Sequence, residues 1–458
     1  MPLIIPANTL SGDYEIDNSL RFNNDDTAYL DFTPSGAGNK KTWTWSGWVK
    51  LGHFDSSNNR TLFSSRQDSS NSFEIKFDNN DKIQVRGYVG GSKTLELNTT
   101  QLFRDVAAWY HVVYALDTSN GTAGNRQHLY INGSEVTSFG TETTPDQNDE
   151  FEINEAQEHQ IGSENGGNLF DGYMADVYFI DGTQKAASDF GETNDNGVWI
   201  PKKYTGSYGT NGWKLEFKQT GTSADASGIG ADTSGNTNHF AVSNLAAIDI
   251  TTDTPTNNFN TLNPLANQMG GTLSEGNTKC VAAAAADKHV FGTFGLTKGK
   301  WYWEVKATDQ GARGSVWVSD SDHNDVIGTN YAGHTFHSGG SVTSGTSNSN
   351  VGSGASDNDI ICFAADLDNG QMWMSKNEDI DTSGTANITG LATTGLNRDY
   401  RISQRETGNP ASTFEHNYGN PPFSISSGNA DANGYGNFEY EVPTNYYALC
   451  TKNLAEFG

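Results

Sequence analysis

The sequence predicts an all-β protein with two β-sandwich domains of the jelly-roll type, joined by a loop-rich linker. Its 51 glycines, and an aromatic content of 11 % beside only 34 % hydrophobic residues, are typical of many short strands joined by turns. Polar and apolar residues alternate in many short runs, as in strands that have one face in a core. The alanine run 282–286 predicts one helical turn at most, because it has no apolar partners at helical spacing.

The segment 170–182, FDGYMADVYFIDG, predicts the strand that closes the first sandwich. Asp-Gly pairs bound this run at both ends as turns. Alternation gives the strand two apolar faces, so we expect it to be covered on each side and a domain boundary to follow near residue 182. The predicted faces are Tyr173, Ala175, Val177 and Phe179 on one side, and Met174, Tyr178 and Ile180 on the other.

The first predicted domain, residues 18–182, repeats a pattern of one alternating strand followed by a polar turn. Asn132-Gly133 is a hairpin dipeptide, and the aromatic residues of the strands are expected to fill the core between two sheets. The motifs WTWSGWVKLG, WYHVVYALDTS, HLYINGSEV, QIGS and FDGYMADVYFIDG resemble, in this order, the laminin-G-like branch of the concanavalin A-like lectin and glucanase superfamily. The resemblance implies a sandwich and leaves function open, because that superfamily includes lectins, hydrolases and plain spacers.

Three further segments complete the predicted organisation. Residues 1–17 are expected to form an N-terminal arm, and 183–265 a connecting segment with a few strands and a Thr/Asn/Pro linker. In 266–458, the motifs GKWYWEV, GSVWVS, DNDIICFAADLDNGQMWMSKN, YRISQ and FEYEVPTNYYALC resemble a SPRY-like domain, which is also a β-sandwich. The sequence departs from that family at Glu378, where glycine commonly completes a turn. The Gly/Ser/Asn tract 333–356 predicts a flexible loop.

Charge and hydropathy disfavour several classes of function. The chain has 28 Lys and Arg against 55 Asp and Glu, a net charge of −27, and its basic residues are scattered, which disfavours nucleic-acid binding. High salt suits such a surface, because screening weakens repulsion between carboxylates. No apolar run is long enough to span a membrane. The start MPLIIPANTL lacks the features of a signal peptide, so we expect assembly in a cytoplasm. The three widely spaced cysteines form neither a disulfide framework nor a metal clip.

No catalytic motif stands out, and the sequence predicts a protein that is not an enzyme. Glycan hydrolases of the concanavalin A-like fold often carry Glu-x-Asp-x-x-Glu on a central strand, because a retaining mechanism needs two nearby carboxyl groups. Glu15 and Asp17 begin that pattern, but position 20 is leucine and the run precedes the first expected strand. The Gly-x-Ser-x-Gly elbow of serine hydrolases is missing from the sequence.

Metal ions, with calcium first, are the cofactors that the sequence suggests. Asp320, Asp322 and Asp325 can gather oxygen ligands around Ca²⁺, and many lectin-like sandwiches hold calcium in rim loops. The alternative is an ordinary solvated turn, because the spacing fails the EF-hand pattern. His334 and His337, with His323 as a further ligand, suggest a transition-metal site; the alternative is a loop too flexible to hold a metal.

Two acidic or amide-rich loops of the first domain are candidates for carbohydrate binding, because such loops place variable chemistry on a rigid sandwich. Asp146 and Asp149 lie in one loop, and Asn165 and Asn168 in the other. Their carboxylate and amide groups can bond sugar hydroxyls or hold a bridging Ca²⁺. The alternative is again a solvated loop, and neither loop carries a tryptophan for stacking.

The N-terminal arm contains the short apolar run Leu3, Ile4 and Ile5. Such a run can add as a strand to the sheet edge of a partner and so serve in assembly. The alternative is a disordered tail.

The order of segments over nearly the whole chain resembles virion structural proteins of marine tailed bacteriophages, especially those that infect cyanobacteria. This resemblance implies a tail-fibre, head-fibre or decoration component on the particle surface. Its expected partners are other virion proteins, further copies of the chain and host cell-surface glycans. The alternatives are a bacterial surface adhesin and a polysaccharide-degrading hydrolase. Without heptads or shaft repeats, a knob is favoured over a long fibre.

Overall fold

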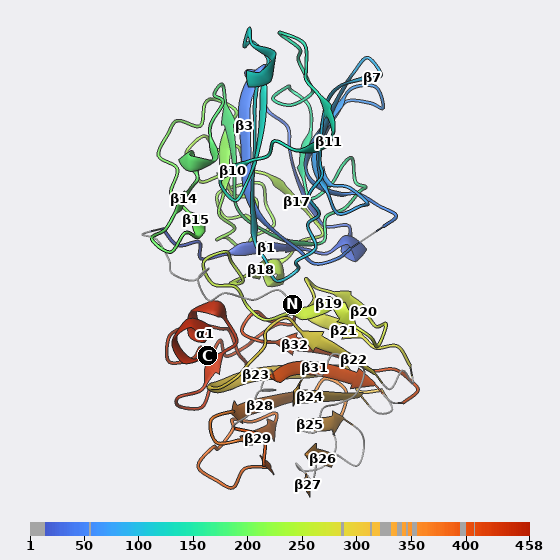
Figure 1. Ribbon diagram of the computed structural model, residues 1–458, viewed down its shortest axis with the longest axis vertical. Helices are drawn as coiled ribbons and strands as arrows, with labels where there is room; N and C mark the ends of the chain where they lie inside the picture. The colour runs from blue at the N-terminus through green and yellow to red at the C-terminus, as the bar shows by residue number, and fades with distance from the viewer. Residues whose placement is uncertain are drawn as a thin grey trace. The chain divides into compact units, whose positions relative to one another are not determined.

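The fold is all-β, as the sequence predicts. The structure is a computed structural model, and it divides into two compact units, Leu10–Thr256 (the first unit) and a second unit that contains Asn257–Gly458. Figure 1 labels their strands. The described residues are 14–54, 56–284, 288–311, 314–320, 331–336, 341–344, 347–349, 355–393, 400–406 and 408–458; in 319–320 and the three short ranges from 331 to 349 only the backbone is described.

The first unit is a sandwich of two eight-stranded sheets. The back sheet has the order β10 (Ser134–Glu135), β9 (Gln127–Ile131), β8 (Tyr110–Asp117), β3 (Thr42–Leu51), β13 (Gly172–Asp181), β1 (Ser19–Phe22) and β18 (Ile250–Thr251), and β16 (Trp213–Leu215) also pairs with β13. The front sheet has the order β11 (Phe139–Thr143), β7 (Ser92–Thr99), β6 (Ile83–Val89), β5 (Ser72–Phe77), β4 (Arg60–Arg66), β12 (His159–Ile161), β2 (Tyr29–Phe32) and β17 (Ala241–Ser243).

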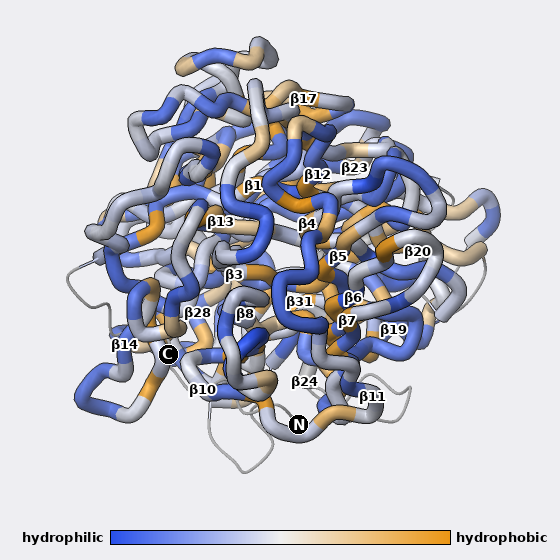
Figure 2. The backbone as a smooth tube through the Cα atoms, turned by 90° about the horizontal axis from the view of Figure 1, so that it is seen from above, coloured by the Kyte–Doolittle hydropathy of each residue, from blue (hydrophilic) through white to orange (hydrophobic). Residues whose placement is uncertain are grey.

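The core lies between these two sheets and is rich in aromatic side chains, as expected from the sequence. Trp43 and Trp45 of β3 are fully buried there, and Trp43 meets Phe73 of β5 edge to face with ring centroids 5.1 Å apart. Edge-to-face contacts suit aromatic rings because the electron-poor edge of one faces the electron-rich plane of the other. Figure 2 shows apolar segments along the strands and hydrophilic ones in many of the loops.

Strand β13 is covered on both faces, as predicted, but the predicted membership of its faces is wrong beyond residue 175. The pairing with β3 shifts register between Ala175 and Tyr178, and Asp176 adopts φ 50°. Such a bulge adds one residue and reverses the alternation after it. Val177 and Phe179 therefore join Met174 in the main core. The opposite face consists of Tyr173, Ala175, Tyr178 and Ile180.

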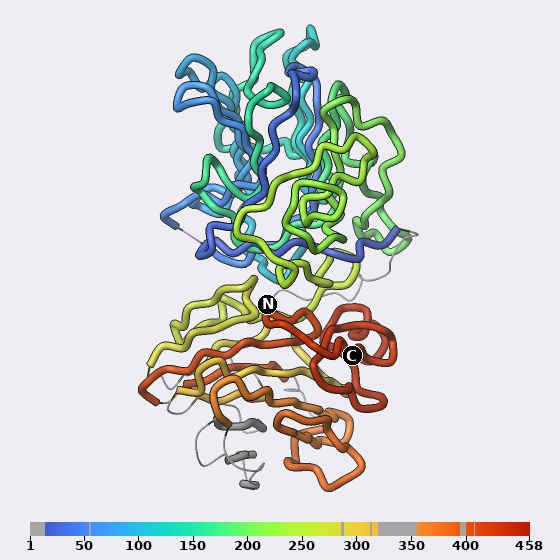
Figure 3. Tube along the Cα trace, turned by 180° about the vertical axis from the view of Figure 1, so that it is seen from behind, coloured from blue at the N-terminus to red at the C-terminus, as the bar shows by residue number. Residues whose placement is uncertain are grey.

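Residues 183–256, expected in part as a connection, belong to the first unit. Three short strands of this segment extend its sheets: β16 pairs with β13, β17 with β2, and β18 with β1. A separate hairpin, β14 (Gly191–Thr193) and β15 (Trp199–Pro201), covers part of the back sheet's outer face, because the Trp199 ring lies against Gly133. Figure 3 shows this segment in green to yellow-green running over the unit.

The second unit also contains two antiparallel sheets. One has the order β19 (Leu262–Asn267), β22 (Lys288–Gly292), β31 (Tyr400–Glu406), β24 (Gly314–Asp320), β25 (Tyr331–Phe336), β26 (Ser341–Ser344) and β27 (Ser347–Ser349). The other has the order β20 (Thr272–Ser274), β21 (Lys279–Val281), β32 (Thr413–Asn417), β23 (Lys300–Asp309), β28 (Ile360–Asp366), β29 (Gln371–Lys376) and β30 (Ile388–Thr389), with β33 (Tyr447–Ala448) parallel to β23.

Two sequence expectations for the second unit have different outcomes. The predicted hairpin at 357–377 is present as β28 and β29, and its predicted inner face, which includes Phe363, lies in the core. The tract 333–356 is not simply a loop, because it contains part of β25 and all of β26 and β27. Strand pairing uses backbone groups, so a glycine- and serine-rich sequence can pair where β24 offers its edge.

Helical structure is minor. The one α-helix among the described residues is α1 (Thr451–Phe457), at the end of the chain. The described residues of the first unit include the 3₁₀ turns η2 (Asn24–Asp26), η3 (Ala123–Asn125), η4 (Ala187–Asp189) and η5 (Ala247–Asp249). Across the described ranges, no helix has the length and apolarity needed to cross a bilayer.

Candidate functional site

The outer face of the front sheet is polar, and we call the part of it over β4 to β7 the polar face. Inward residues of these strands fill the core, so alternation directs the intervening polar residues outward. Register aligns them in two cross-strand rows. One row is Ser64, Glu74, Arg86 and Glu96, and the other is Arg66, Ser72, Tyr88 and Lys93.

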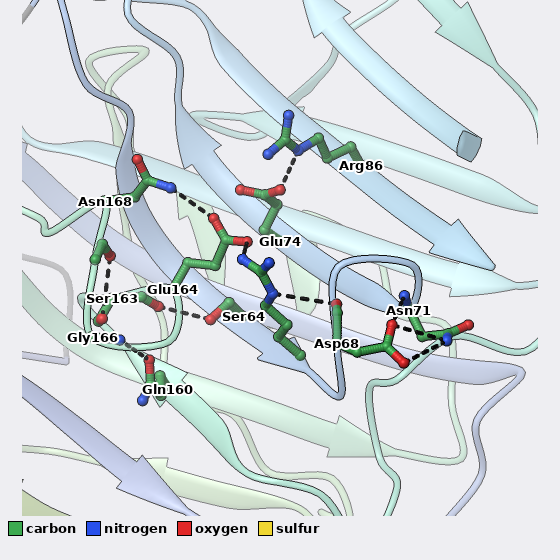
Figure 4. Close-up of polar contacts among 12 residues, drawn as sticks. Ser64, Asp68, Asn71, Glu74, Arg86, Gln160, Ser163, Glu164, Gly166 and Asn168 are labelled. Atoms are coloured by element: carbon green, nitrogen blue, oxygen red, sulfur yellow. Dashed lines mark hydrogen bonds and ion pairs between the residues drawn. The ribbon is translucent and has the colours of Figure 1, made fainter. Parts of the chain in front are cut away.

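The loop that follows β12 contributes further groups to the polar face (Figure 4). Glu164 is buried there; its Oε1 accepts from Arg66 at 3.0 Å and its Oε2 from the Asn168 amide at 2.7 Å. The loop is fixed to β4, because the Thr61 backbone N–H donates to the Asn168 carbonyl at 2.8 Å. Asn165 and Asn168 both have positive φ, a conformation that asparagine tolerates better than most residues.

A second carboxylate, Glu74, lies at the centre of the polar face. Lys76 donates to its Oε2 at 2.8 Å, and Arg86 donates through Nε to its Oε1. Both Glu74 and Lys76 are fully buried. Burial lowers the pKa of Lys76, and the neighbouring Glu74 carboxylate opposes that shift. The face is therefore a fixed array of charges, not a set of freely rotating side chains.

Tyr88 supplies an aromatic surface on the same face. Its side chain is partly exposed, and the Arg86 guanidinium carbon lies 5.6 Å from the ring centroid. This cation–π contact fixes the two side chains relative to each other. Neither Tyr88 nor Arg86 was predicted from the sequence. The alternating sequence IQVRGYV of β6 could have indicated them, because it directs Gln84, Arg86 and Tyr88 to the same side of the strand.

The four predicted carbohydrate-binding residues lie in two places. Asn165 and Asn168 border the polar face, where Asn165 is exposed and the Asn168 amide is engaged by Glu164. Asp146 and Asp149 lie in a loop packed against the end of β8, where Thr118 donates to the Asp149 carbonyl at 2.7 Å. The Asp149 carboxylate also accepts from the Asp146 backbone N–H, which closes a turn. Asp146 itself is exposed.

Several predicted residues fall outside what the structure describes. Leu3, Ile4, Ile5, Asp322, Asp325, His323 and His337 lie outside the described residues, and Asp320 and His334 are described only as backbone of β24 and β25. Within the described part of the chain, no three His, Cys, Asp or Glu side chains are grouped so that they could hold a metal ion. The calcium and histidine sites therefore stay predictions.

In a buried Ser-His pair of the back sheet, the histidine donates its hydrogen bond to the serine, which is the opposite of what nucleophilic catalysis needs. His111 Nε2 lies 2.9 Å from Ser46 Oγ, and Trp199 Nε1 lies 3.0 Å from His111 Nδ1. The indole nitrogen only donates, so Nδ1 must accept, and Nε2 then carries the proton that bonds Ser46. A general base would need a free lone pair at that position. Burial lowers the pKa of His111 to about 3, which keeps the ring neutral.

The start of the hydrolase pattern lies beside another buried carboxylate. Glu15 and Asp17 are exposed, precede β1 and line a small pocket together with Asp176. Asp176 accepts hydrogen bonds from Tyr14 at 3.1 Å to each carboxylate oxygen, and Lys214 Nζ lies 3.2 Å from its Oδ1. Burial raises the pKa of Asp176, and Lys214 opposes that shift. These contacts secure residues 14–17 to the outer face of the back sheet.

Comparison with known proteins found a family match in the first unit. Residues 24–188 match the model of the family described as the concanavalin A-like lectin/glucanases superfamily. Comparison with curated proteins gave no match.

Several solved structures are similar to the chain. A putative carbohydrate binding protein from Bacteroides ovatus is 16 % identical with a TM-score of 0.32; the match covers 51 % of this chain and 59 % of that one. The PSpry domain of TRIM65 is 14 % identical with a TM-score of 0.28 and coverages of 34 % and 88 %. Domains LG4-5 of the mouse laminin alpha1 chain are 8 % identical with a TM-score of 0.29 and coverages of 94 % and 98 %.

The family match and the two packed antiparallel sheets agree with the resemblance that the motifs of the first domain indicated. Four of the five motifs that carried it form β3, β8, β9 with β10, and β13 of the back sheet, and QIGS lies at β12 of the front sheet. The first unit therefore has the concanavalin A-like, laminin-G-like lectin fold, and its matched residues are 24–188.

Proposed function

We propose that this protein is a bacteriophage virion structural protein that binds glycans of the host surface through the polar face of its first unit. The observation that carries the binding part is the combination on one sheet face of an aromatic ring, Tyr88, with fixed carboxylates, cations and amides. Sugars present both apolar ring faces and hydroxyl groups that donate and accept hydrogen bonds, so they need both kinds of surface.

Tyr88→Ala tests the glycan-binding role. We expect binding of the purified chain to host cells to weaken about threefold to tenfold, the range expected when one aromatic contact is lost. Tyr130→Ala is the matched control, because Tyr130 is a partly exposed tyrosine on β9 of the back sheet. Equal binding by the two variants, with both still folded, would refute a role of the polar face.

We propose that the first unit binds glycans without cleaving them. The Ser46 hydroxyl oxygen accepts a hydrogen bond from His111 Nε2–H, and both carboxylate oxygens of Glu74 accept hydrogen bonds from cations. Incubation of the chain with host envelope polysaccharide is expected to release no reducing sugar. Release of reducing ends by the wild type, and its loss in Glu74→Gln, would favour the hydrolase alternative.

Calcium belongs to the proposal as a bridge at the acidic loop. The exposed Asp146 side chain and the Asp149 carboxylate at the same turn provide oxygen ligands of the kind that Ca²⁺ prefers. EDTA is then expected to weaken cell binding, and Asp146→Ala with Asp149→Ala to do the same without lowering the thermal midpoint. Binding unaffected by either treatment would remove this loop from the site.

Placement on the virion rests on the resemblance of the whole chain to structural proteins of marine phages, and the charge of −27 suits a surface exposed to salt water. Tail-fibre, head-fibre and decoration roles all fit, with other virion proteins and further copies of the chain as partners. Mass spectrometry of purified particles is the test. Recovery of the chain from a bacterial envelope fraction, and not from particles, would favour the adhesin alternative.

A further inference from the structure

Three ion pairs on the polar face share one arrangement: the carboxylate is buried and the cation is exposed. The exposed fractions of cation and carboxylate are 33 % and 6 % for Arg66 with Glu164, and 26 % and 1 % for Arg86 with Glu74. For Lys93 with Glu96 they are 36 % and 5 %. The carboxylates lie against the sheet and hold the cations above them, so solvent meets positive charge on this face.

These exposed positive charges contrast with the negative net charge of the molecule. The chain as a whole carries −27, and other ion pairs of the first unit have the opposite order. In the pairs Lys40–Glu155, Lys214–Glu216 and Arg21–Asp249, the carboxylate is the more exposed partner. The exposed cations over β4, β6 and β7 therefore contrast with these pairs, and outside the polar face Arg104 with Asp81 shares their order.

The register spaces these cations across the sheet. Arg66, Tyr88 and Lys93 belong to one cross-strand row on β4, β6 and β7. Neighbouring strands lie about 4.8 Å apart, so the Arg66 and Lys93 backbones are separated by about 14 Å, with Tyr88 between them. Arg86 lies two residues along β6 from Tyr88 and sits against its ring. The row is long enough for an extended chain of sugars, not only for a single ion.

The guanidinium groups keep donors for a ligand. Among the contacts of the described residues, Arg86 donates only through Nε, to Glu74, and Arg66 donates through Nε and one terminal nitrogen. The remaining terminal N–H groups can donate hydrogen bonds to two oxygens of a carboxylate or of a sulfate ester. The neighbouring Asp68 carboxylate is engaged by the backbone N–H groups of Ser70 and Asn71.

We propose that the polar face selects acidic polysaccharides, whose carboxylate or sulfate groups bind Arg66, Arg86 and Lys93 while a sugar ring packs on Tyr88. This inference rests on the glycan-binding function proposed above and adds the class of ligand. On one side the site ends at two carboxylates, because Glu158 and Asp31 lie at β12 and β2 of the same sheet. The acidic chain therefore runs over β4 to β7 and not toward β2.

The test measures binding of the full chain to four polymers at 0.05 M and 0.5 M NaCl, about a threefold change in Debye length. The polymers are polyguluronate, dextran sulfate, dextran and polyglutamate. Dextran and dextran sulfate share one backbone, and polyglutamate carries carboxylates without sugars. We expect binding to polyguluronate or dextran sulfate that weakens in high salt, and at least tenfold weaker binding to dextran and polyglutamate.

Arg66→Gln with Arg86→Gln is expected to weaken binding of the acidic polymers by about tenfold or more, the effect of losing one or two charge-assisted hydrogen bonds. Arg104→Gln is the matched control, because Arg104 is also the exposed partner of a buried carboxylate, Asp81, at the β5–β6 turn. If the double variant is unstable, Lys93→Gln and the salt dependence of the wild type provide the same readout.

The outcomes separate the two proposals. Binding of dextran as tight as that of dextran sulfate, or no loss in the double variant, overturns the acidic-ligand inference and leaves glycan binding standing. Binding of polyglutamate as tight as that of the acidic sugars overturns it as well, because charge alone would then suffice. No binding to any saccharide, including host polysaccharide, overturns the proposed function itself.

Discussion

Replacement of Asp253 by asparagine is expected to destabilise the first unit strongly. Asp253 and Lys50 are fully buried, and their Oδ2 and Nζ atoms are 2.7 Å apart. Trp109 donates to the other carboxylate oxygen at 3.2 Å, and Ser19 donates to the Asp253 carbonyl at 2.6 Å. These contacts join the last segment of the unit to β3 and β1. An asparagine keeps the volume of the side chain but removes the negative charge that lies 2.7 Å from the buried Lys50 ammonium.

Breaking a buried ion pair by removal of one partner costs about 3–5 kcal/mol. For a unit of this length, each 1 kcal/mol lowers the thermal midpoint by about 2–4 °C, so Asp253→Asn is expected to lower it by about 6–20 °C. Differential scanning calorimetry at pH 7 measures this shift. Asp17→Asn is the matched control: its pair with Lys218, at 3.5 Å, is exposed on both sides and contributes little.

Equal midpoints for these two variants would refute the reasoning. A second variant separates charge from packing. Lys50→Met with Asp253→Leu removes both charges together, and its midpoint is expected to lie well above that of Asp253→Asn, because no uncompensated charge remains.

Three more predictions concern Gly133, two buried histidines and Glu304. Gly133→Ala should lower the midpoint more than Gly182→Ala, because both positions have positive φ but only a Cβ at Gly133 meets an indole ring, at 2.4 Å; equal shifts would contradict this. Burial lowers the pKa of His111 to about 3 and of His159 to about 4, so the unfolded chain binds these protons first. Stability present above about pH 6.5 should be lost as pH falls toward 4, by about 1.4 kcal/mol per pH unit for each imidazole; thermal melts that do not change between pH 7 and 5 would contradict it. Glu304→Gln should destabilise the second unit by about 1–3 kcal/mol in denaturant titrations, because two backbone N–H groups would face an amide in place of a carboxylate; an unchanged denaturation midpoint would refute this role.

The fold was predictable because strand alternation and turn dipeptides are local signals. Asn132-Gly133 and the apolar run of β13 needed no knowledge of distant residues. The exchange of faces within β13 was not predictable, because Asp176 adopts its bulge conformation only beside the particular partners of that strand. A few strands were expected in the segment 183–265, but the positions of β17 and β18 were not predicted, because two or three residues are too few to show a period.

The candidate site was harder to predict than the fold. Alternation shows that Arg66 and Arg86 point away from the core, but not which groups they meet. Arg66 pairs with Glu164, 98 residues later, and this contact exists only because β12 lies beside β4 in the sheet. Loop chemistry therefore made Asn165 and Asn168 predicted binding residues, whereas the sheet face that this loop borders was not predicted.

The pairing of β1 with β18, the first and last strands of the first unit, affects how the unit can be inserted into another protein. Ser19, in its first strand, faces Thr251, in its last, across an antiparallel pair. The Cα atoms of Ser19 and Thr251, near the two ends of the unit, are thus about 5 Å apart, the distance between paired residues of neighbouring strands. A module with adjacent ends can be inserted into a surface loop of a host protein without stretching it. Recombination that keeps residues 19 to 253 together would also transplant the Lys50–Asp253 pair, whereas a crossover at residue 182 would remove the edge strands β18 and β17 from the two sheets.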